Sequence, residues 1–242
     1  MKPKILPGCS SFYNRKWSEV FYPEELPSKD WFAYYCTQFN TFEINSTFYK
    51  MPTAKSLQTW HQKSPADFKF SLKVPKLITH INKLQDCEQL LNEFYTSVES
   101  IIDKVACVLF QFPPSYYFTT ERLELLMKNM NPKFNNAVEF RHESWWIDDV
   151  YEAFRNNNII FSNVNYPKLP TEIITTHPIG YLRLHGNPKL FYSEYSKEML
   201  ESLIKEIEMS AATEFYIYFN NTASTAGIIN ALAVRESMKV SR

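Results

Sequence analysis

The sequence predicts an α/β fold, a single TIM-type (β/α)8 barrel whose sixth unit is degenerate, and three observations support this prediction. Short apolar strand segments alternate with helical segments along the chain at about 30 residues a unit, which is the βαβ pattern. The length of 242 residues is usual for an eight-unit barrel. Several strand segments also turn polar on one face near their carboxyl ends, where such barrels hold their active sites.

The first four units are predicted from residue spacing. Runs rich in aromatic and β-branched residues predict strands, and apolar residues at intervals of three and four predict helices. The fourth strand stops at Pro113 and Pro114, because proline cannot donate to a strand ladder. The first predicted strand ends at Gly8 and Ser10, and the next three cover residues 41–45, 68–74 and 106–112. The first predicted helix contains Leu26, Trp31, Phe32 and Tyr35, and the next three cover 54–62, 87–102 and 121–130.

The last four units follow the same pattern with one exception. The sixth strand is followed by a segment with Pro167 and Pro170 that has no helical spacing, so this unit is degenerate. The predicted strands cover residues 137–141, 159–164, 180–185 and 214–221, and the helices cover 148–156, 197–209 and 226–240. No linker or low-complexity tract interrupts the sequence, and we expect residues 1–242 to form one domain.

Alternation of period two separates an apolar and a polar face in these strands. Phe42 and Ile44 lie on one face of their strand, and Glu43 and Asn45 lie on the other. The same alternation puts further polar residues on the second face near the carboxyl ends: Lys73, Gln111, Glu139, Arg141, Arg183, His185 and Asn220. We therefore expect these side chains to converge at the carboxyl-terminal mouth of the barrel.

Composition argues against two classes of partner. Lys and Arg together number 26, as do Asp and Glu, so the formal net charge is zero. No basic field over the whole protein favours nucleic acid or an anionic membrane surface, and any anion binding must be local.

The cysteines predict a reducing compartment. Cys9, Cys36, Cys87 and Cys107 are far apart and lack CxxC spacing, which argues against a zinc site and a disulfide framework. LPGCS resembles a lipoprotein cleavage box, but the apolar run before it is too short for a secretion signal. No run is long enough to cross a bilayer, and a cytoplasmic protein without a membrane partner is expected.

Several motifs resemble those of the YecE-like proteins, a family catalogued as a domain of unknown function. They span nearly the whole chain in order: GCSSFY, FEINSTFYKMP, FSLKVPKLITH, LFQFPPS, AVEFRHESWW, YLRLHG and YIYFNNT. The resemblance implies a β/α barrel and supplies no established activity. Ser11 departs from the family pattern, which has a glycine there, and its Cβ would strain a left-handed backbone.

The mouth residues predict an enzyme that acts on a small anionic substrate, phosphorylated or carboxylated. Arg141 and Arg183 have the fork geometry that suits phosphate or carboxylate, and we expect them to hold the anion. Glu43 and His185 are the acid/base candidates. Alternatively, the arginines pair with Glu43 and Glu139 in the top layer of the barrel. The other expected substrate-binding residues are Asn45, Lys73, His80, Gln111, Glu139, Trp145, Asn220 and Tyr13.

His80 could equally fill or cap its apolar loop. Among aromatic residues in loops after strands, most are expected to pack on the barrel rim, and Trp145 and Tyr13 are the two expected to contact a ligand.

Two alternatives remain open at the level of sequence. A nucleic-acid-binding or nucleic-acid-processing protein would stack bases on the rim aromatics. A metal-dependent site would use Glu43, Glu139, His80 and His185 as ligands. No cofactor or metal is predicted, because no compact ligand motif is present and Arg141 and Arg183 would repel a cation.

The expected protonation states follow from crowding these groups together. Arginine charges should lower the pKa of Glu139, whereas Glu43 is expected to remain the titratable base.

Overall fold

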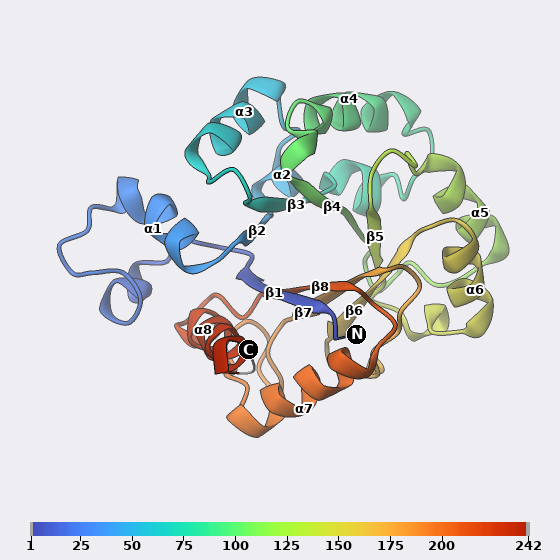
Figure 1. Ribbon diagram of the computed structural model, residues 1–242. Coiled ribbons are helices and arrows are strands. Elements are labelled where there is room, and N and C mark those ends of the chain that lie inside the picture. The colour runs from blue at the N-terminus through green and yellow to red at the C-terminus, as the bar shows by residue number, and fades with distance from the viewer. Residues whose placement is uncertain (1, 241–242) are drawn as a thin grey trace.

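The computed structural model describes residues 2–240 and places eight strands in a ring surrounded by helices (Figure 1). Every paired strand is parallel to its neighbour, in the order β1-β8-β7-β6-β5-β4-β3-β2, and β1 and β2 lie next to each other where the ring closes. The predicted TIM-like α/β barrel is thereby confirmed. The strands are β1 (Lys4–Cys9), β2 (Thr41–Ile44), β3 (Lys69–Lys73), β4 (Val105–Gln111), β5 (Asn136–Glu139), β6 (Ile160–Asn165), β7 (Ile179–Leu184) and β8 (Glu214–Phe219).

The helices begin where the sequence supplies caps. Thr53 and Ser56 form a capping box at the start of α3, and the side chains of Thr119 and Ser196 accept backbone N–H groups at the starts of α5 and α7. The helices are α1 (Trp31–Gln38), α2 (Ser46–Tyr49), α3 (Ala54–Lys63), α4 (Glu88–Glu99), α5 (Thr120–Asn129), α6 (Asp148–Asn156), α7 (Lys197–Met209) and α8 (Ala226–Val240).

Residues 166–178, between β6 and β7, contain no helix, as the degenerate sixth unit predicts. Several short elements were not predicted, and two of them follow strands and bring residues to the mouth. One is α2, and the other is a π-helical turn, Leu77–Ile81. Short 3-10 helices also cover Arg15–Glu19, Ser28–Asp30, Ile102–Lys104 and Glu143–Trp145.

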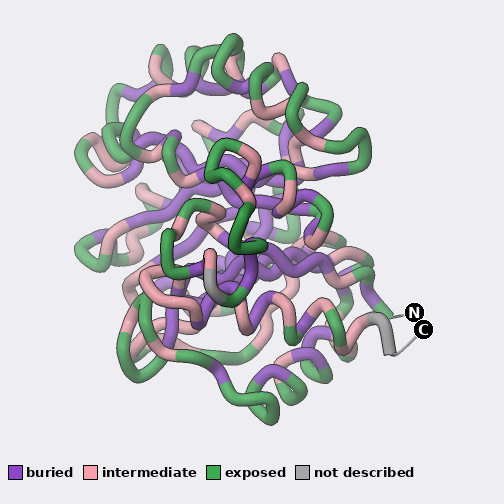
Figure 2. Tube along the Cα trace, turned by 90° about the vertical axis from the view of Figure 1, so that its left-hand side faces the viewer, coloured by how far each residue is buried: buried purple, intermediate pink, exposed green. Residues whose placement is uncertain are grey.

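Buried residues form two apolar clusters, which strand alternation assigns to the outer and inner faces of the barrel. Figure 2 shows the buried part of the chain gathered in the middle of the molecule. The outer cluster holds the apolar strand face predicted from alternation, including Phe42, Ile44 and Phe140, packed under the helices. The inner cluster fills the barrel below the mouth and includes Leu109, Tyr181 and Tyr218. Because the interior is packed with side chains, ligands can enter the barrel only at its mouth.

The seam between β1 and β2 is closed by a side chain. Lys4 and Ser10 donate their backbone N–H groups to carbonyl oxygens on the β8 side. By alternation, the backbone nitrogens of Pro7 and Cys9 point toward β2, but the nitrogen of Pro7 carries no hydrogen to donate. The buried Tyr35 hydroxyl accepts the Cys9 N–H at 2.8 Å and donates to the Thr41 carbonyl oxygen at 3.0 Å. One tyrosine therefore replaces the strand hydrogen bonds that β1 cannot make with β2.

We expect Tyr35→Phe to lower the free energy of unfolding by about 1–3 kcal/mol, because a buried N–H and a buried carbonyl lose their partner. Urea denaturation measures the loss. The neighbouring Tyr34→Phe is the matched control, since Tyr34 is only half-buried. Equal losses for the two variants would show that the hydroxyl does not hold the seam.

The structure also bears on three expectations from the sequence, which concern membrane spans, the cysteines and the backbone at Ser11. No helix in residues 2–240 is long and apolar enough to cross a membrane. The four cysteines are buried and free of disulfide bonds. Ser11 is not among the residues with positive φ, and its hydroxyl accepts the Tyr13 N–H at 3.2 Å, so the loop follows a course that tolerates the Cβ.

Candidate functional site

The mouth of the barrel encloses a hollow of about 270 Å³ at the carboxyl ends of the strands. Strand alternation brings most of the predicted side chains to it, and α2 and the loops after β4 and β7 complete the wall. The lining residues are Asn45, Phe48, Tyr49, Lys73, Gln111, Pro114, Arg141, Arg183, His185, Phe191 and Asn220.

Arg183 lies at the centre of a buried ion-pair network below this hollow. It is 1% exposed, and Glu43 and Glu139 are 0% exposed. Its Nε and Nη2 donate to the two oxygens of Glu43 at 2.9 and 2.8 Å, and its Nη1 donates to Glu139 at 2.8 Å. Nη2 also donates to the Asn220 side-chain oxygen at 2.8 Å. The guanidinium is therefore directed at protein carboxylates, which corrects the expectation that Arg183 holds a ligand anion through free N–H groups.

Arg141 connects the same network to the hollow. Its Nε donates to Glu139, its Nη2 donates to His185 Nε2 at 3.0 Å, and its guanidinium lies 4.0 Å from the centre of the Tyr166 ring. Nη1 has no hydrogen-bond partner within residues 2–240. Arg141 is thus fixed by three neighbours while one end of its guanidinium stays available at the hollow.

Glu43 supports Arg183 and does not face a ligand. Besides Arg183, it accepts hydrogen bonds from Tyr181 at 2.7 Å and from Asn45 at 3.0 Å. Burial would raise its pKa, but the charge and hydrogen bonds of Arg183 hold the pKa of Glu43 below its usual value. The expectation that Glu43 is a tunable base is therefore wrong: it is inaccessible and stabilised as a carboxylate.

The pKa of Glu139 shifts in the expected direction, but Glu139 does not line the hollow as a substrate-binding residue would, because it is fully buried with both oxygens engaged by arginine. Burial opposes its ionisation, but Arg141 and Arg183 hold the pKa of Glu139 well below its usual value. The two carboxylates and two arginines carry compensating charges, so the network as a whole is neutral.

Lys73 stands out because its ammonium group has no ion-pair partner among the described residues. It ends β3 and is 9% exposed, and its Nζ makes no ion pair or hydrogen bond with any described residue. Its Nζ lies 3.9 Å from the centre of the Phe48 ring. Burial, reinforced by the charge of Arg183, lowers the pKa of Lys73 to about 7, despite the opposing carboxylates. A substantial fraction of the amine is therefore unprotonated at neutral pH.

His185 is a neutral imidazole in this setting. Because a guanidinium can only donate, His185 Nε2 must accept from Arg141, which leaves the hydrogen on Nδ1. Burial and then the charge of Arg141 lower the pKa of His185 to about 3. Nδ1 is buried without a hydrogen-bond partner. His185 is thus held as a neutral imidazole with a buried Nδ1–H, which does not favour the acid/base role expected from the sequence.

Three further predicted residues lie at the rim. Gln111 lines the hollow and donates to its neighbour, the Phe112 carbonyl oxygen, at 2.7 Å. His80, on the π-helical turn, lies beside Gln111 and Phe48, and burial lowers the pKa of His80 to about 4. Asn45 leaves its side-chain oxygen buried and unpaired. A buried acceptor and a buried donor without partners mark the mouth as incomplete without a ligand or solvent.

Trp145 does not reach the mouth. Its side chain is fully buried, stacks on Phe140 with ring centres 3.9 Å apart, and donates through Nε1 to the Tyr116 carbonyl oxygen. The expectation that Trp145 contacts a ligand is therefore corrected: it belongs to the outer core.

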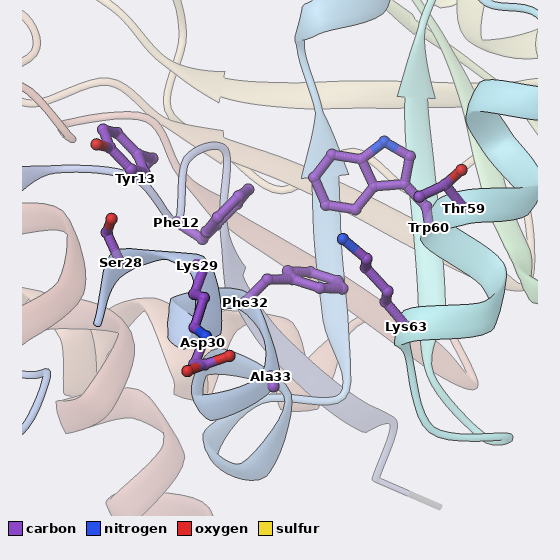
Figure 3. A pocket seen from close by; sticks show the side chains of 10 residues that line it. All are labelled: Phe12, Tyr13, Ser28, Lys29, Asp30, Phe32, Ala33, Thr59, Trp60 and Lys63. Carbon is purple, nitrogen blue, oxygen red and sulfur yellow. The ribbon is translucent and has the colours of Figure 1, made fainter. Parts of the chain in front are cut away.

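Tyr13 lies in a different place, a cleft of about 730 Å³ on the outside of the barrel between α1 and α3. Figure 3 shows Phe12, Phe32 and Trp60 around this cleft, with Tyr13 at one end. The cleft is larger than the mouth, but it contains none of the residues that the strands bring together. Neither Trp145 nor Tyr13 is therefore in position to stack on a ligand bound at the mouth.

The predicted metal ligands do not assemble. The oxygens of Glu43 and Glu139 are engaged by arginine, and His185 Nε2 accepts from Arg141. Within the described part of the chain, no three or more His, Cys, Asp or Glu side chains are grouped closely enough to hold a metal ion. Glu43, Glu139, His80 and His185 therefore form no preassembled metal site.

Sequence reasoning missed Tyr181 and Phe48. Tyr181 lies two residues before Arg183 on the inward face of β7, so period two could have found it. Phe48 lies on α2, whose four residues are too few to show helical periodicity. Only the folded chain shows that its ring contacts Lys73.

Comparison with known proteins yields relatives without a known activity. A family model described as "Protein of unknown function DUF72" matches residues 6–242. The UPF0759 protein YecE of Escherichia coli is 27% identical over 155 residues, which cover 63% of this chain and 54% of that protein, so the match spans about half of the relative's length. The UPF0759 protein YunF of Bacillus subtilis is 27% identical over 244 residues, covering 86% of each chain.

Among solved structures, a DUF72 family protein from Thermotoga maritima has a TM-score of 0.88 and 31% identity, covering 98% of this chain and 99% of its own. A glycoside hydrolase family 5 enzyme from Prevotella bryantii has a TM-score of 0.56 at 12% identity, covering 96% of this chain and 92% of its own. The latter likeness shows the barrel fold alone.

Proposed function

This chain belongs to the DUF72 family, whose function is unknown, and we propose that it is an enzyme acting on a small anionic substrate, phosphorylated or carboxylated, at the mouth of the barrel. One observation carries the proposal: two cationic groups of residues that line the mouth, Lys73 Nζ and Arg141 Nη1, have no acceptor within the described chain. Donors gathered without an acceptor complement an anion.

The charges of the residues at the mouth support the same proposal. Glu43 and Glu139 offset Arg183 and Arg141, so the charge on Lys73 decides whether the mouth is neutral or positive. A protonated Lys73 makes it positive and favours an anion. At about 270 Å³, the hollow is slightly smaller than the usual ligand pocket, which favours a small metabolite.

Lys73 also supports catalysis rather than binding alone. A group whose pKa lies near the working pH can both give and take a proton efficiently. Lys73 meets this condition with its pKa of about 7, and it takes the acid/base role that sequence reasoning assigned to Glu43.

The test is anion-dependent thermal stabilisation, with inorganic phosphate and acetate as probes. We expect each probe that binds to raise the melting temperature of the wild type, and phosphate at 100 times its Kd should add about 2.7 kcal/mol. Lys73→Met and Arg141→Met should lose most of this effect. Because Lys69 lies on the same strand and donates to the Asp103 carbonyl oxygen, Lys69→Met is the matched control for lost charge.

The pH dependence has a defined sign. Acetate carries one negative charge throughout this range and needs protonated Lys73, so acetate affinity should fall as pH rises through about 7. Stabilisation by acetate that is independent of pH between 6 and 8.5, or equal in the Lys73 and Lys69 variants, would contradict the proposal.

A further inference from the structure

We propose that Lys73 is a nucleophile that forms a covalent imine with the carbonyl group of the substrate, which would then be a small oxo acid or a phosphorylated aldehyde or ketone. This inference rests on the proposed function, because it assumes that the substrate binds in the same hollow. It adds the reaction class and the group that bonds to the substrate.

The first argument is a contrast between two buried lysines. Lys104 is 4% exposed, and its Nζ donates to the carbonyl oxygens of His61 and Ser64 and to the Ser64 hydroxyl, all within 2.9 Å. A buried structural lysine thus finds its acceptors in this fold. Lys73 is nearly as buried, lines a cavity, and has no hydrogen-bond acceptor within residues 2–240.

The second argument is that the nearby carboxylates are occupied. Arg183 takes both oxygens of Glu43 and one oxygen of Glu139, and Arg141 takes the other oxygen of Glu139. No described carboxylate oxygen lies within ion-pairing distance of Lys73 Nζ. A buried amine near guanidinium groups and without a carboxylate partner is the environment in which lysine becomes an effective nucleophile.

The third argument is the neighbourhood of the amine. Phe48 packs against Nζ from α2 and limits where the amine can point. Arg141 and His185 line the same hollow, although the Nδ1–H of His185 is itself buried. An anionic group on Arg141 would orient the substrate, and hydrogen bonds from the mouth would stabilise the oxyanion that develops as the amine attacks.

The chemistry balances without a further reactant. The nitrogen lone pair of neutral Lys73 attacks the carbonyl carbon and forms a C–N bond. The carbonyl oxygen then leaves as water with the two hydrogens of the amine, which gives a C=N bond. Protonation of this imine by solvent makes it an electron sink for bond cleavage or proton abstraction at the adjacent carbon.

The experiment is reductive trapping of the wild-type protein with glyoxylate and sodium cyanoborohydride, followed by peptide mapping by mass spectrometry. At pH 7, an amine with a pKa of about 7 is half unprotonated, against about 0.04% for an ordinary lysine. We therefore expect one adduct, on Lys73, forming up to about 10³-fold faster than adducts on surface lysines, with a rate at low glyoxylate that peaks near pH 7, where the charged amine that favours the anion and the neutral amine that attacks are both populated. Modification spread over surface lysines, without preference for Lys73, would overturn the proposal.

Two variants refine the test. Lys73→Arg keeps the charge but cannot form the imine, so it should lose the fast adduct, whereas Lys69→Arg should keep it. Arg141→Met should lower the ratio of glyoxylate trapping to acetaldehyde trapping about tenfold or more, because acetaldehyde has no anionic group; the ratio cancels any change in the reactivity of Lys73 itself. Mapping on the wild type decides the question even if a variant fails to fold.

The outcomes separate the two proposals. Phosphate stabilisation of the wild type without trapping at Lys73 would overturn the imine and leave the proposed anion site intact. Equal trapping of glyoxylate and acetaldehyde, with no protection by phosphate, would support the nucleophile and overturn the anionic substrate. Absence of both stabilisation and trapping would overturn both.

Discussion

Replacing Arg183 with methionine is expected to lower the free energy of unfolding by about 3–5 kcal/mol, the usual cost of removing one partner from a buried ion pair. Glu43 would keep hydrogen bonds from Tyr181 and Asn45 but would lose its one ion-pair partner among residues 2–240, at a position with no exposure to solvent. Urea denaturation at pH 7 measures the loss.

The same variant has a predicted pH dependence. In the wild type, the depressed pKa of Glu43 contributes stability at neutral pH that is lost as pH falls below about 4.3, the unfolded value. Without Arg183, burial raises the pKa of Glu43, so the variant loses stability as pH rises through that raised value. The difference in free energy of unfolding between wild type and variant should therefore become smaller as pH falls from 7 to 5.

The exposed Arg155 on α6 provides the control, and Arg155→Met should change stability by less than about 0.5 kcal/mol. Adding Glu43→Gln to the Arg183 variant should recover part of the loss, because it removes the uncompensated charge. A loss no larger than that of Arg155→Met would contradict the buried network.

Replacing Trp145 with alanine is expected to lower the free energy of unfolding by about 3–5 kcal/mol, the usual loss when a large aromatic side chain is removed from a core. The ring stacks on Phe140 and lies parallel to Tyr116 at 5.6 Å between ring centres, and its Nε1 hydrogen bond would also be lost. Calorimetry or urea denaturation measures the effect. A stable Trp145→Ala variant with impaired ligand binding would restore the ligand-stacking role expected from sequence.

The adjacent tryptophan is the matched control. Trp146 is only partly buried and packs edge-on against Phe161 with ring centres 5.2 Å apart. Trp146→Ala should therefore lower the free energy of unfolding by less than Trp145→Ala does. Because both variants replace tryptophan with alanine, the difference between the two losses reflects how deeply each ring is buried.

The fold could be predicted because its signals are local and repeated. The bounds of α6, α7 and α8 follow from helical spacing, and those of the strands follow from runs that end at turn residues. The four residues of α2 and the five of the π-helical turn Leu77–Ile81 carry no such periodicity. These two elements bring Phe48 and His80 to the mouth, and therefore the contacts of those residues were not predicted.

Loop aromatics could not be assigned from sequence. Trp145 and Tyr13 both follow strands, but one enters the outer core and the other lies at the cleft between α1 and α3. The direction of a side chain in an irregular loop depends on the helices packed around it, and no local period encodes that packing.

By itself, the sequence determined which strand residues face into the barrel, because alternation of period two is a property of the extended backbone. It thereby placed Glu43, Lys73, Glu139 and Arg183 at the mouth. Only the tertiary structure decided their partners, since Arg183 on β7 meets Glu43, 140 residues away on β2, across the barrel. Ion pairing requires a few ångströms between charged groups, and the closure of the strands sets that distance. The same closure leaves Lys73 without a partner, which no reading of β3 alone could show.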